Sequence, residues 1–316
     1  MRWRHPLHAF PTGTVDMTHR QTMFSVIIPT YNRRALITCA LDSVWAQRFT
    51  DFEVIVVDDG STDGTVGAIC APSGRLTVIQ EPNRGPGAAR NTGARRATGD
   101  YLAFLDSDDL WFPWTLETFA HVIREQQAPA VLAGQVVEFV DDRTLGDVRQ
   151  EAVEADVFED YLAASAAGYG VGAGMSVLRR DEFLKTGGFT DRRINCEDHD
   201  LILRMGTAGG FAQVVRPATL AWRRHGGGTT MDPMRTAAGC RYLIEQERRG
   251  AYPGGRSRAQ ERRRIVTRHT RPASLSCLRA GLRAESWWLY RESFVWQVRL
   301  GRWRYLLGFP VKALLS

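Results

Sequence analysis

Short apolar runs alternate with amphipathic stretches along the first hundred residues of the chain. The apolar runs predict buried strands over 24–28, 52–57, 76–79 and 101–105. The stretches between them predict helices over 34–47, 63–70 and 87–97. Strands that are apolar throughout and are separated by helices indicate a parallel sheet covered on both faces. The pattern therefore predicts a doubly wound α/β fold of nucleotide-binding type.

Polar clusters follow three of these strands, at 29–32, 58–61 and 106–109. In open α/β sheets, ligands bind beyond the carboxyl ends of the strands, so we expect the three clusters to converge on one crevice. Each cluster alone also suits a turn or a helix cap. Their shared placement favours a nucleotide site.

Three carboxylates stand within four residues at Asp106, Asp108 and Asp109. Like charges this close repel each other and resist burial, so the cluster needs compensation. A hard divalent cation held by oxygen ligands supplies it, and carboxylate-bound Mg²⁺ or Mn²⁺ usually serves substrate phosphates. The cluster predicts a metal-diphosphate site, although a polar turn before a helix would also use these residues.

The ordered motifs together resemble those of the family 2 glycosyltransferases, which have the GT-A fold. The motifs that carry the resemblance are those at 29–33, 56–63, 85–91, 106–109, 187–189, 197–201 and 222–225. The similarity covers about residues 24–230. The Gln-x-x-Arg-Trp motif of processive members is missing from the chain. The resemblance thus implies an inverting, metal-dependent enzyme that moves one sugar from a nucleotide-sugar, most simply a UDP-sugar, to an acceptor.

The resemblance also assigns the donor site. It implies nucleotide-sugar contacts from Pro29, Thr30, Tyr31, Asp59, Arg90, Asn91, Asp106 and Ser107. Tyr31 would stack near the nucleobase, Asp59 would accept the imide hydrogen of the base, and Asp106 would approach the ribose. An aromatic face with a carboxylate acceptor suits uracil.

Metal and acid-base roles follow from the same resemblance. Asp108 and His225 would bind Mn²⁺ or Mg²⁺, and Asp109 would face the helix after it. Asp198 would be the catalytic base that removes the acceptor hydroxyl proton, and Glu197 would contact the acceptor or support the loop. Both carboxylates also suit the positive end of a helix.

Charge divides the chain into an acidic body and a basic tail. The net charge of +6 combines 23 minus 29, or −6, over residues 1–231 with 18 minus 6, or +12, over 232–316. We expect a disordered extension over 1–22, a GT-A domain over 23–230 and a basic helical C-terminal region over 231–316.

Within the basic region, a helix over 232–249 and a connector over 250–275 precede a terminal helix from Ala284. An apolar stripe on that helix contains Leu289, Trp296, Leu300, Trp303 and Leu307, and the opposite side carries Arg291, Arg299 and Arg302. Such a helix suits an anionic membrane surface, or else it packs on the domain as core. Nucleic acid is not expected, because no binding module accompanies the charge.

The five cysteines form no Cys-x-x-Cys pair, which argues against a zinc site and a disulfide framework. We expect a cytoplasmic protein at the inner face of the cytoplasmic membrane, acting on a lipid-linked or polysaccharide acceptor. The alternatives are a nucleotidyltransferase and an inactive nucleotide-sugar-binding protein. The first would need a glycine-rich loop with a basic residue after the first strand, and the second is disfavoured by the presence of Asp108 and Asp198.

Overall fold

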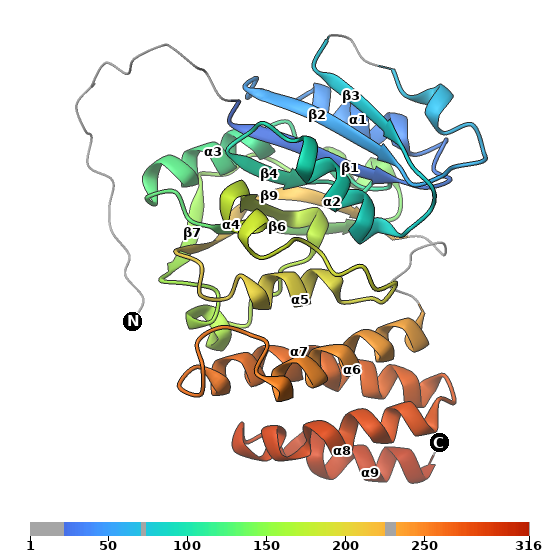
Figure 1. Cartoon of the computed structure of the whole chain (residues 1–316), viewed down its shortest axis with the longest axis vertical. Helices are drawn as coiled ribbons and strands as arrows, with labels where there is room; N and C mark the ends of the chain where they lie inside the picture. Colours follow the sequence, from blue (N-terminus) through green and yellow to red (C-terminus); the bar gives the residue numbers. More distant parts are fainter. Residues whose placement is uncertain (1–21, 71–73, 225–231, 316) are drawn as a thin grey trace.

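A computed structural model of the chain describes residues 22–70, 74–224 and 232–315 (Figure 1). Nearly all of the predicted extension over 1–22 lies outside these ranges. The described strands form a nine-stranded sheet in the order β3-β2-β1-β4-β8-β6-β9-β5, with β7 paired to β9. They are β1 (Phe24–Thr30), β2 (Phe52–Asp58), β3 (Leu76–Gln80), β4 (Tyr101–Phe104), β5 (Leu110–Trp111), β6 (Val131–Phe139), β7 (Glu154–Phe158), β8 (Ser176–Arg179) and β9 (Phe211–Arg223).

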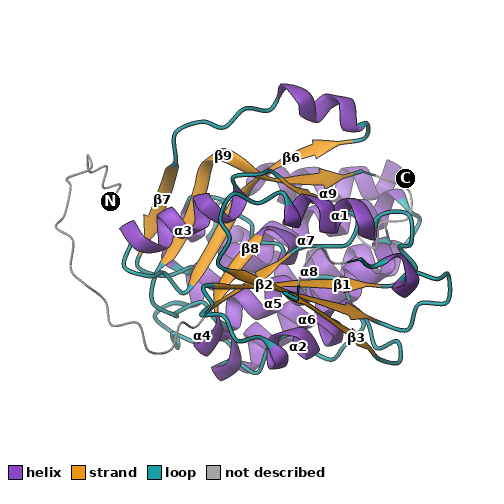
Figure 2. Ribbon diagram, turned by 90° about the horizontal axis from the view of Figure 1, so that it is seen from above, coloured by secondary structure: helices purple, strands orange, loops and turns teal. Residues whose placement is uncertain are grey.

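Helices cover both faces of this sheet, which confirms the α/β prediction. They are α1 (Ile37–Trp45), α2 (Pro86–Arg96), α3 (Thr115–Glu125), α4 (Arg180–Lys185), α5 (Glu197–Arg204), α6 (Pro233–Arg249), α7 (Ala259–Arg279), α8 (Arg283–Arg299) and α9 (Trp303–Leu315). In the view from above, the strands cross the molecule and the C-terminal helices lie beneath them (Figure 2). The predicted helix over 63–70 is wrong, because only a 3₁₀ turn at Val66–Ala68 forms there.

The four strands predicted from apolar runs, β3, β2, β1 and β4, pair in parallel. All of β1 is buried because its side chains alternate between two apolar layers. Val26 and Ile28 pack with α1 and α3 on one face, whereas Ile27 packs with α2 and α5 on the other. The parallel pairing brings the carboxyl ends of β1, β2 and β4 to one edge of the sheet.

The predicted helix over 232–249 is confirmed as α6, whose N-terminus is capped by the Asp232 side chain. The predicted connector over 250–275 is wrong, because most of it is the 21-residue helix α7. Two of its arginines are paired rather than solvated: Arg262 Nε and Arg263 Nε lie 2.7 and 3.1 Å from the carboxylate of the buried Glu247. Tertiary pairing therefore stabilises a helix that looked like a charged linker.

The predicted terminal helix is two helices, α8 and α9, separated by a break near Gly301. The break divides the apolar stripe, since Leu289 and Trp296 are buried whereas Trp303 and Leu307 are 56% and 72% exposed. Arg302 does not face solvent as expected, because its guanidinium donates to Thr267 Oγ1 at 2.8 Å. One part of the stripe thus packs as core and the other remains on the surface.

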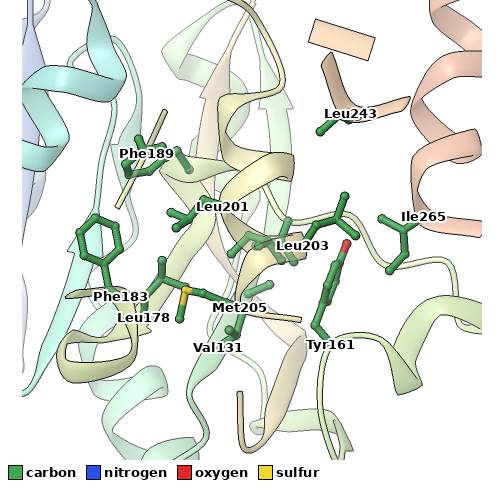
Figure 3. Packing of buried hydrophobic residues seen from close by; sticks show 14 of the residues in the cluster. Val131, Tyr161, Leu178, Phe183, Phe189, Leu201, Leu203, Met205, Leu243 and Ile265 are labelled. Atoms are coloured by element: carbon green, nitrogen blue, oxygen red, sulfur yellow. The ribbon is translucent and has the colours of Figure 1, made fainter. Parts of the chain in front are cut away.

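One apolar core continues from the sheet through α5 into the C-terminal helices (Figures 1 and 3). Leu203 of α5, Leu243 of α6 and Ile265 of α7 belong to it. The two parts approach closely, since a Cβ on Gly239 of α6 would lie 1.8 Å from the carbonyl oxygen of Asn195. Along the described ranges, no helix has the length and apolar character needed to cross a bilayer.

Candidate active site

The three polar clusters meet at the carboxyl edge of the parallel strands, as expected. The backbone N–H of Asn32 donates to Ser61 Oγ at 2.9 Å, which joins the first cluster to the second. Arg33 Nη2 lies 3.3 Å from Asp108 Oδ2, which joins the first to the third. Arg33 was not among the predicted site residues, although its position directly after the first cluster could have indicated it.

Two buried polar atoms at this edge have no hydrogen-bond partner within the described structure. They are Thr30 Oγ1 and Asp58 Oδ1, on residues that pair across β1 and β2. Paired residues in a parallel ladder project to the same face, so both atoms lie on one side of the sheet. Tyr31, next to Thr30, exposes 47% of its surface, and Pro29 is buried in β1. The exposed ring is free to stack on a base.

Asp59 holds the loop over 81–85, which connects β3 to α2. Its Oδ1 accepts the N–H of Arg84 at 2.7 Å and its Oδ2 accepts the N–H of Gly85 at 2.8 Å. Each carboxylate oxygen keeps a second acceptor site. The predicted contact with a base imide stays a prediction, and loop support is a second role that the structure adds.

Both polar atoms of the Asn91 side chain form hydrogen bonds with the protein backbone. Its Nδ2 donates to the carbonyl of Phe189 at 2.9 Å, and its Oδ1 accepts the N–H of the same residue at 2.8 Å. The side chain is buried, as is that of Ser107. The nucleotide contacts predicted for these two residues stay predictions, and the structure assigns Asn91 a bridge between α2 and the 187–190 turn.

The Asp106–Asp109 cluster crowds three carboxylates at the strand end. Asp109 does not face the following helix as expected, since its Oδ1 accepts the N–H of Arg223 on β9 at 2.9 Å. Burial, reinforced by Asp106 and Asp108 and opposed by the Arg223 N–H, raises the pKa of Asp109 to about 8. Asp106 and Asp108 are the two more exposed carboxylates of the cluster, and oxygen ligands of this kind suit a hard divalent cation.

Of the two predicted metal ligands, Asp108 lies within the described residues. His225 lies outside the described residues. Within 22–70, 74–224 and 232–315, no three His, Cys, Asp or Glu side chains converge as a ready-made metal cage. A carboxylate pair completed by phosphate oxygens and water is a normal arrangement for Mg²⁺.

Arg90 joins the strand-end cluster to the start of α5. Its Nη2 lies 2.5 Å from Asp106 Oδ1 and its Nη1 lies 3.3 Å from Glu197 Oε1. The side chain is 4% exposed. Burial opposes its charge, but the carboxylates of Asp106 and Glu197 raise the pKa of Arg90 above its ordinary value. Glu197-Asp198 therefore lies beside Asp106-x-Asp108 in space.

Glu197 begins α5, directly after Cys196, whose backbone is left-handed with φ of 68°. Burial, reinforced by Asp198 and opposed by Arg90, raises the pKa of Glu197 to about 7. With Arg90 on one side and the first turn of α5 on the other, this side chain supports the site rather than facing open solvent.

Asp198 is held by two backbone donors. Its Oδ1 accepts the N–H of His199 at 2.7 Å, and its Oδ2 accepts the N–H of Ala173 at 3.3 Å. The side chain remains 23% exposed. Ala173 belongs to a glycine-rich segment over 168–174, and none of the sequence motifs indicated that this segment touches the predicted base.

A glycine shapes the other side of the same segment. A Cβ on Gly174 would lie 3.2 Å from Asp106 Oδ2. The absence of a side chain there leaves room for the carboxylate. The 172–174 backbone thus passes between Asp106 and Asp198.

Comparison with known proteins decides the family. The sequence model of glycosyl transferase family 2 matches residues 25–186, which is half of the chain. The chain belongs to this family. The assignment confirms the resemblance drawn from the strand-end motifs and disfavours a nucleotidyltransferase.

Named relatives belong to polysaccharide synthesis. The chain is 31% identical to the amylovoran biosynthesis glycosyltransferase AmsB of Erwinia amylovora over 61% of this chain and 67% of that protein. It is 46% identical to the succinoglycan biosynthesis protein ExoW of Rhizobium meliloti over 28% and 30% of the two chains. It spans only 16% of two matched Rickettsia glycosyltransferases and 62% of one from Haemophilus influenzae.

Solved structures confirm the GT-A-like fold of this family 2 member. TarS of S. aureus in complex with UDP is 25% identical, with a TM-score of 0.61 over 78% of this chain and 71% of that chain. TarS with UDP-GlcNAc has a TM-score of 0.63 at 22% identity, over 88% and 92% of the two chains. A mannosyltransferase of Pyrobaculum calidifontis, in complex with GDP-Man and Mn²⁺, has a TM-score of 0.52 at 22% identity, over 94% and 88%.

Proposed function

We propose that this family member is an inverting, metal-dependent glycosyltransferase that moves one sugar from a nucleotide-sugar to a lipid-linked or polysaccharide acceptor. The observation that carries the proposal is the double ion pair of Arg90 with Asp106 and Glu197. One guanidinium spans the gap between the two motifs, so a donor at the strand ends lies next to the proposed base. A UDP-sugar is the favoured donor, in keeping with the UDP and UDP-GlcNAc bound by TarS.

Tyr31, at the end of β1, offers an exposed ring for the nucleobase. Arg33 and Arg90 bring positive charge to the region where a diphosphate carries negative charge. This arrangement orients the donor with its sugar toward α5.

Asp198 removes the proton of the acceptor hydroxyl while that oxygen attacks the anomeric carbon and the bond to the diphosphate breaks. A general base must lie within hydrogen-bond reach of the proton it takes. The N–H groups of His199 and Ala173 donate to the two oxygens of Asp198 and fix the direction of the carboxylate.

Asp108 and His225 would hold Mn²⁺ or Mg²⁺. A divalent cation there would supply charge neutralisation of the leaving nucleoside diphosphate. The side chains of Asp106 and Asp108 are 36% and 20% exposed, so their oxygens remain accessible to such an ion.

A screen of UDP-, GDP- and dTDP-sugars for Mn²⁺-dependent binding and hydrolysis tests the proposal. We expect Asp108→Asn to weaken metal-dependent nucleotide binding. Asp198→Asn should leave that binding intact and abolish transfer, because it removes only the proton acceptor. Asp147→Asn, which alters an exposed carboxylate outside the site, is the matched control. Normal transfer by Asp198→Asn would show that the base assignment is wrong.

We further propose that the C-terminal helices bind an anionic membrane surface through α9. One face of α9 packs inward through Tyr305, Leu306, Phe309 and Ala313. The other exposes a stripe of apolar side chains, Trp303, Leu307, Val311, Leu314 and Leu315. No acidic residue lies in α9, whereas Arg304 and Lys312 are exposed beside the stripe. Apolar and basic groups on one outer face suit an anionic bilayer, and α9 lies at the end of the molecule away from the sheet (Figure 1).

Co-sedimentation with vesicles of phosphatidylglycerol and phosphatidylcholine tests the membrane proposal. Leu307→Asp should weaken binding by about tenfold or more, given about 1.5–3 kcal/mol for burying a leucine side chain. Leu184→Asp makes the same change on an exposed face of α4 and should bind like the wild type. A protein that ignores the vesicles but dimerises through α9 would overturn the proposal.

A further inference from the structure

Helix α7 holds the segment that leads to the proposed base. The guanidinium of Arg268 donates from Nη2 to the carbonyl of Ser165 at 2.7 Å and from Nη1 to the carbonyl of Tyr169. The Tyr161 hydroxyl donates to the same Tyr169 carbonyl at 3.4 Å. The start of the glycine-rich 168–174 segment is therefore fixed from two directions.

The far end of that segment supports Asp198. The N–H of Ala173 donates to Asp198 Oδ2, four residues after the carbonyl that Arg268 holds. Glycines at 170 and 172 give the intervening backbone more freedom than other residues would. An external anchor at Tyr169 therefore limits how far Ala173 can move from the carboxylate.

The next residue of α7 supports the other side of the base. The His269 ring stacks on the His199 ring with centroids 3.6 Å apart and planes 25° from parallel. His199 is the residue after Asp198, and its backbone N–H donates to Asp198 Oδ1. Burial, reinforced by His199 and Arg268, lowers the pKa of His269 well below its ordinary value, so this ring packs as a neutral group.

We propose that Arg268 and His269 are positioning residues for the catalytic base, one acting through the 165–173 segment and the other through His199. This inference rests on the proposed role of Asp198. Neither side chain needs to touch the substrate. The C-terminal region would then be part of the catalytic apparatus in addition to any part in membrane binding.

The charged and titratable groups around the base come from several elements. Those that interact with Asp198 are Arg90 of α2, Tyr161 and Cys196 of the connecting segments, and Glu197 and His199 of α5. Arg268 and His269 of α7 stand behind Tyr161 and His199. These neighbours keep their own side chains in an Arg268 variant, so a fall in kcat at unchanged UDP binding reports the lost anchor at Tyr169.

The test compares Arg268→Gln with Arg279→Gln, the same substitution at an exposed site in the last turn of α7. The assay is UDP release from UDP-glucose, UDP-galactose and UDP-N-acetylglucosamine with Mn²⁺, with water in place of the acceptor. We expect Arg268→Gln to lower kcat at least about tenfold, since a misplacement of about 1 Å can cost about a hundredfold. UDP binding should stay within about twofold of the wild type.

Conservative replacement separates positioning from general damage. Arg268→Lys, which retains a donor, should recover part of the rate. Arg279→Gln should keep the wild-type rate.

A second pair of variants tests His269. His269→Phe keeps an aromatic face against His199 and should stay near the wild-type rate, whereas His269→Ala should lower kcat with UDP binding kept. The inference is overturned if Arg268→Gln matches Arg279→Gln in rate, or if rate and UDP binding fall together. Asp198→Asn is assayed in parallel, because normal turnover by this variant would refute the role of Asp198 as the base. The positioning roles of Arg268 and His269 are thereby tested separately from that role.

Discussion

At the scale of single residues, Arg90 shows how one side chain assembles a site from distant motifs. It is buried, it contacts Asp106 and Glu197, and its guanidinium lies 5.3 Å from the Phe189 ring centre. Breaking a buried pair leaves an uncompensated charge, so its removal would disturb both motifs at once. Asn91 and Glu197, two neighbours of Arg90, also contact protein groups whose loss can be measured.

Asn91→Ala should destabilise the fold. The substitution leaves the N–H and the carbonyl of Phe189 without partners, and an unmet buried polar group costs about 1–3 kcal/mol. We expect the free energy of unfolding in urea to fall by about 2–4 kcal/mol. Arg96→Ala, at an exposed position on the same helix, should change it by less than about 0.5 kcal/mol. Weaker nucleotide binding at unchanged stability would instead support direct contact.

Glu197 should make stability depend on pH. Burial and Asp198 raise its pKa from 4.5 to about 7, so the folded protein binds more protons than the unfolded chain between these values. The contribution of Glu197 to the free energy of unfolding is therefore present below about pH 4.5 and is lost as the pH rises to about 7.

Glu197→Gln cannot ionise and should gain stability over the wild type as the pH rises through this window. Urea unfolding of both proteins on either side of the window measures the gain. A difference in unfolding free energy that does not vary with pH would contradict the assignment.

At the scale of elements, α7 was the main error of the sequence interpretation. Its arginine-rich sequence indicates a solvated connector, yet Arg262 is buried against Glu247, and Arg268 caps carbonyls of the 165–169 segment. A helix with several arginines can pack against the domain when carboxylates and carbonyls of other elements pair with the guanidinium groups. Those partners are far away in sequence.

Glu247→Ala should therefore destabilise the C-terminal helices strongly. It leaves Arg262 as an unpaired buried charge, and breaking such a pair costs about 3–5 kcal/mol. Glu245→Ala, two positions away on α6 and more exposed, should cost less than about 1 kcal/mol. Chemical unfolding followed by circular dichroism compares the two, and equal losses would show that the Arg262 pair is not what matters.

At the scale of the whole molecule, one core is continuous while the charge is divided between the two parts of the chain. The core joins the sheet to α5, α6 and α7, so the basic region packs against the helix that carries Asp198. Part of the +12 charge of residues 232–316 is neutralised or hydrogen-bonded inside the fold, by Glu247 and by backbone carbonyls. The outer face of α9 leaves apolar and basic side chains exposed.

Membrane binding through this end should depend on salt. Because exposed charges are screened within about 10 Å at 0.1 M salt, raising NaCl should weaken binding to phosphatidylglycerol vesicles. The apolar stripe on α9 should leave a salt-resistant remainder that Leu307→Asp removes. Binding to pure phosphatidylcholine vesicles with the same affinity at all salt concentrations would exclude the electrostatic part.

The strand ends show how far sequence reasoning reaches. The clusters at 29–32, 58–61 and 106–109 were expected to converge, and the ion pair of Arg33 with Asp108 and the bond of Asn32 to Ser61 join them. Asp109 was misplaced because its partner, the N–H of Arg223, lies on a strand more than a hundred residues later. A local sequence pattern predicts the element on which a residue lies, but it does not identify the hydrogen-bond partners that distant elements supply.

The sequence by itself determined the parallel strands, the α/β class, the family and the edge at which the site lies, because these follow from apolar periodicity and from motifs at strand ends. Only the tertiary structure decided that Arg90 joins the two carboxylate motifs, that α7 is a helix behind the base, and that the apolar stripe is half core and half surface. The physical reason is that burial and charge pairing belong to contacts between distant segments. No local window of sequence contains both partners.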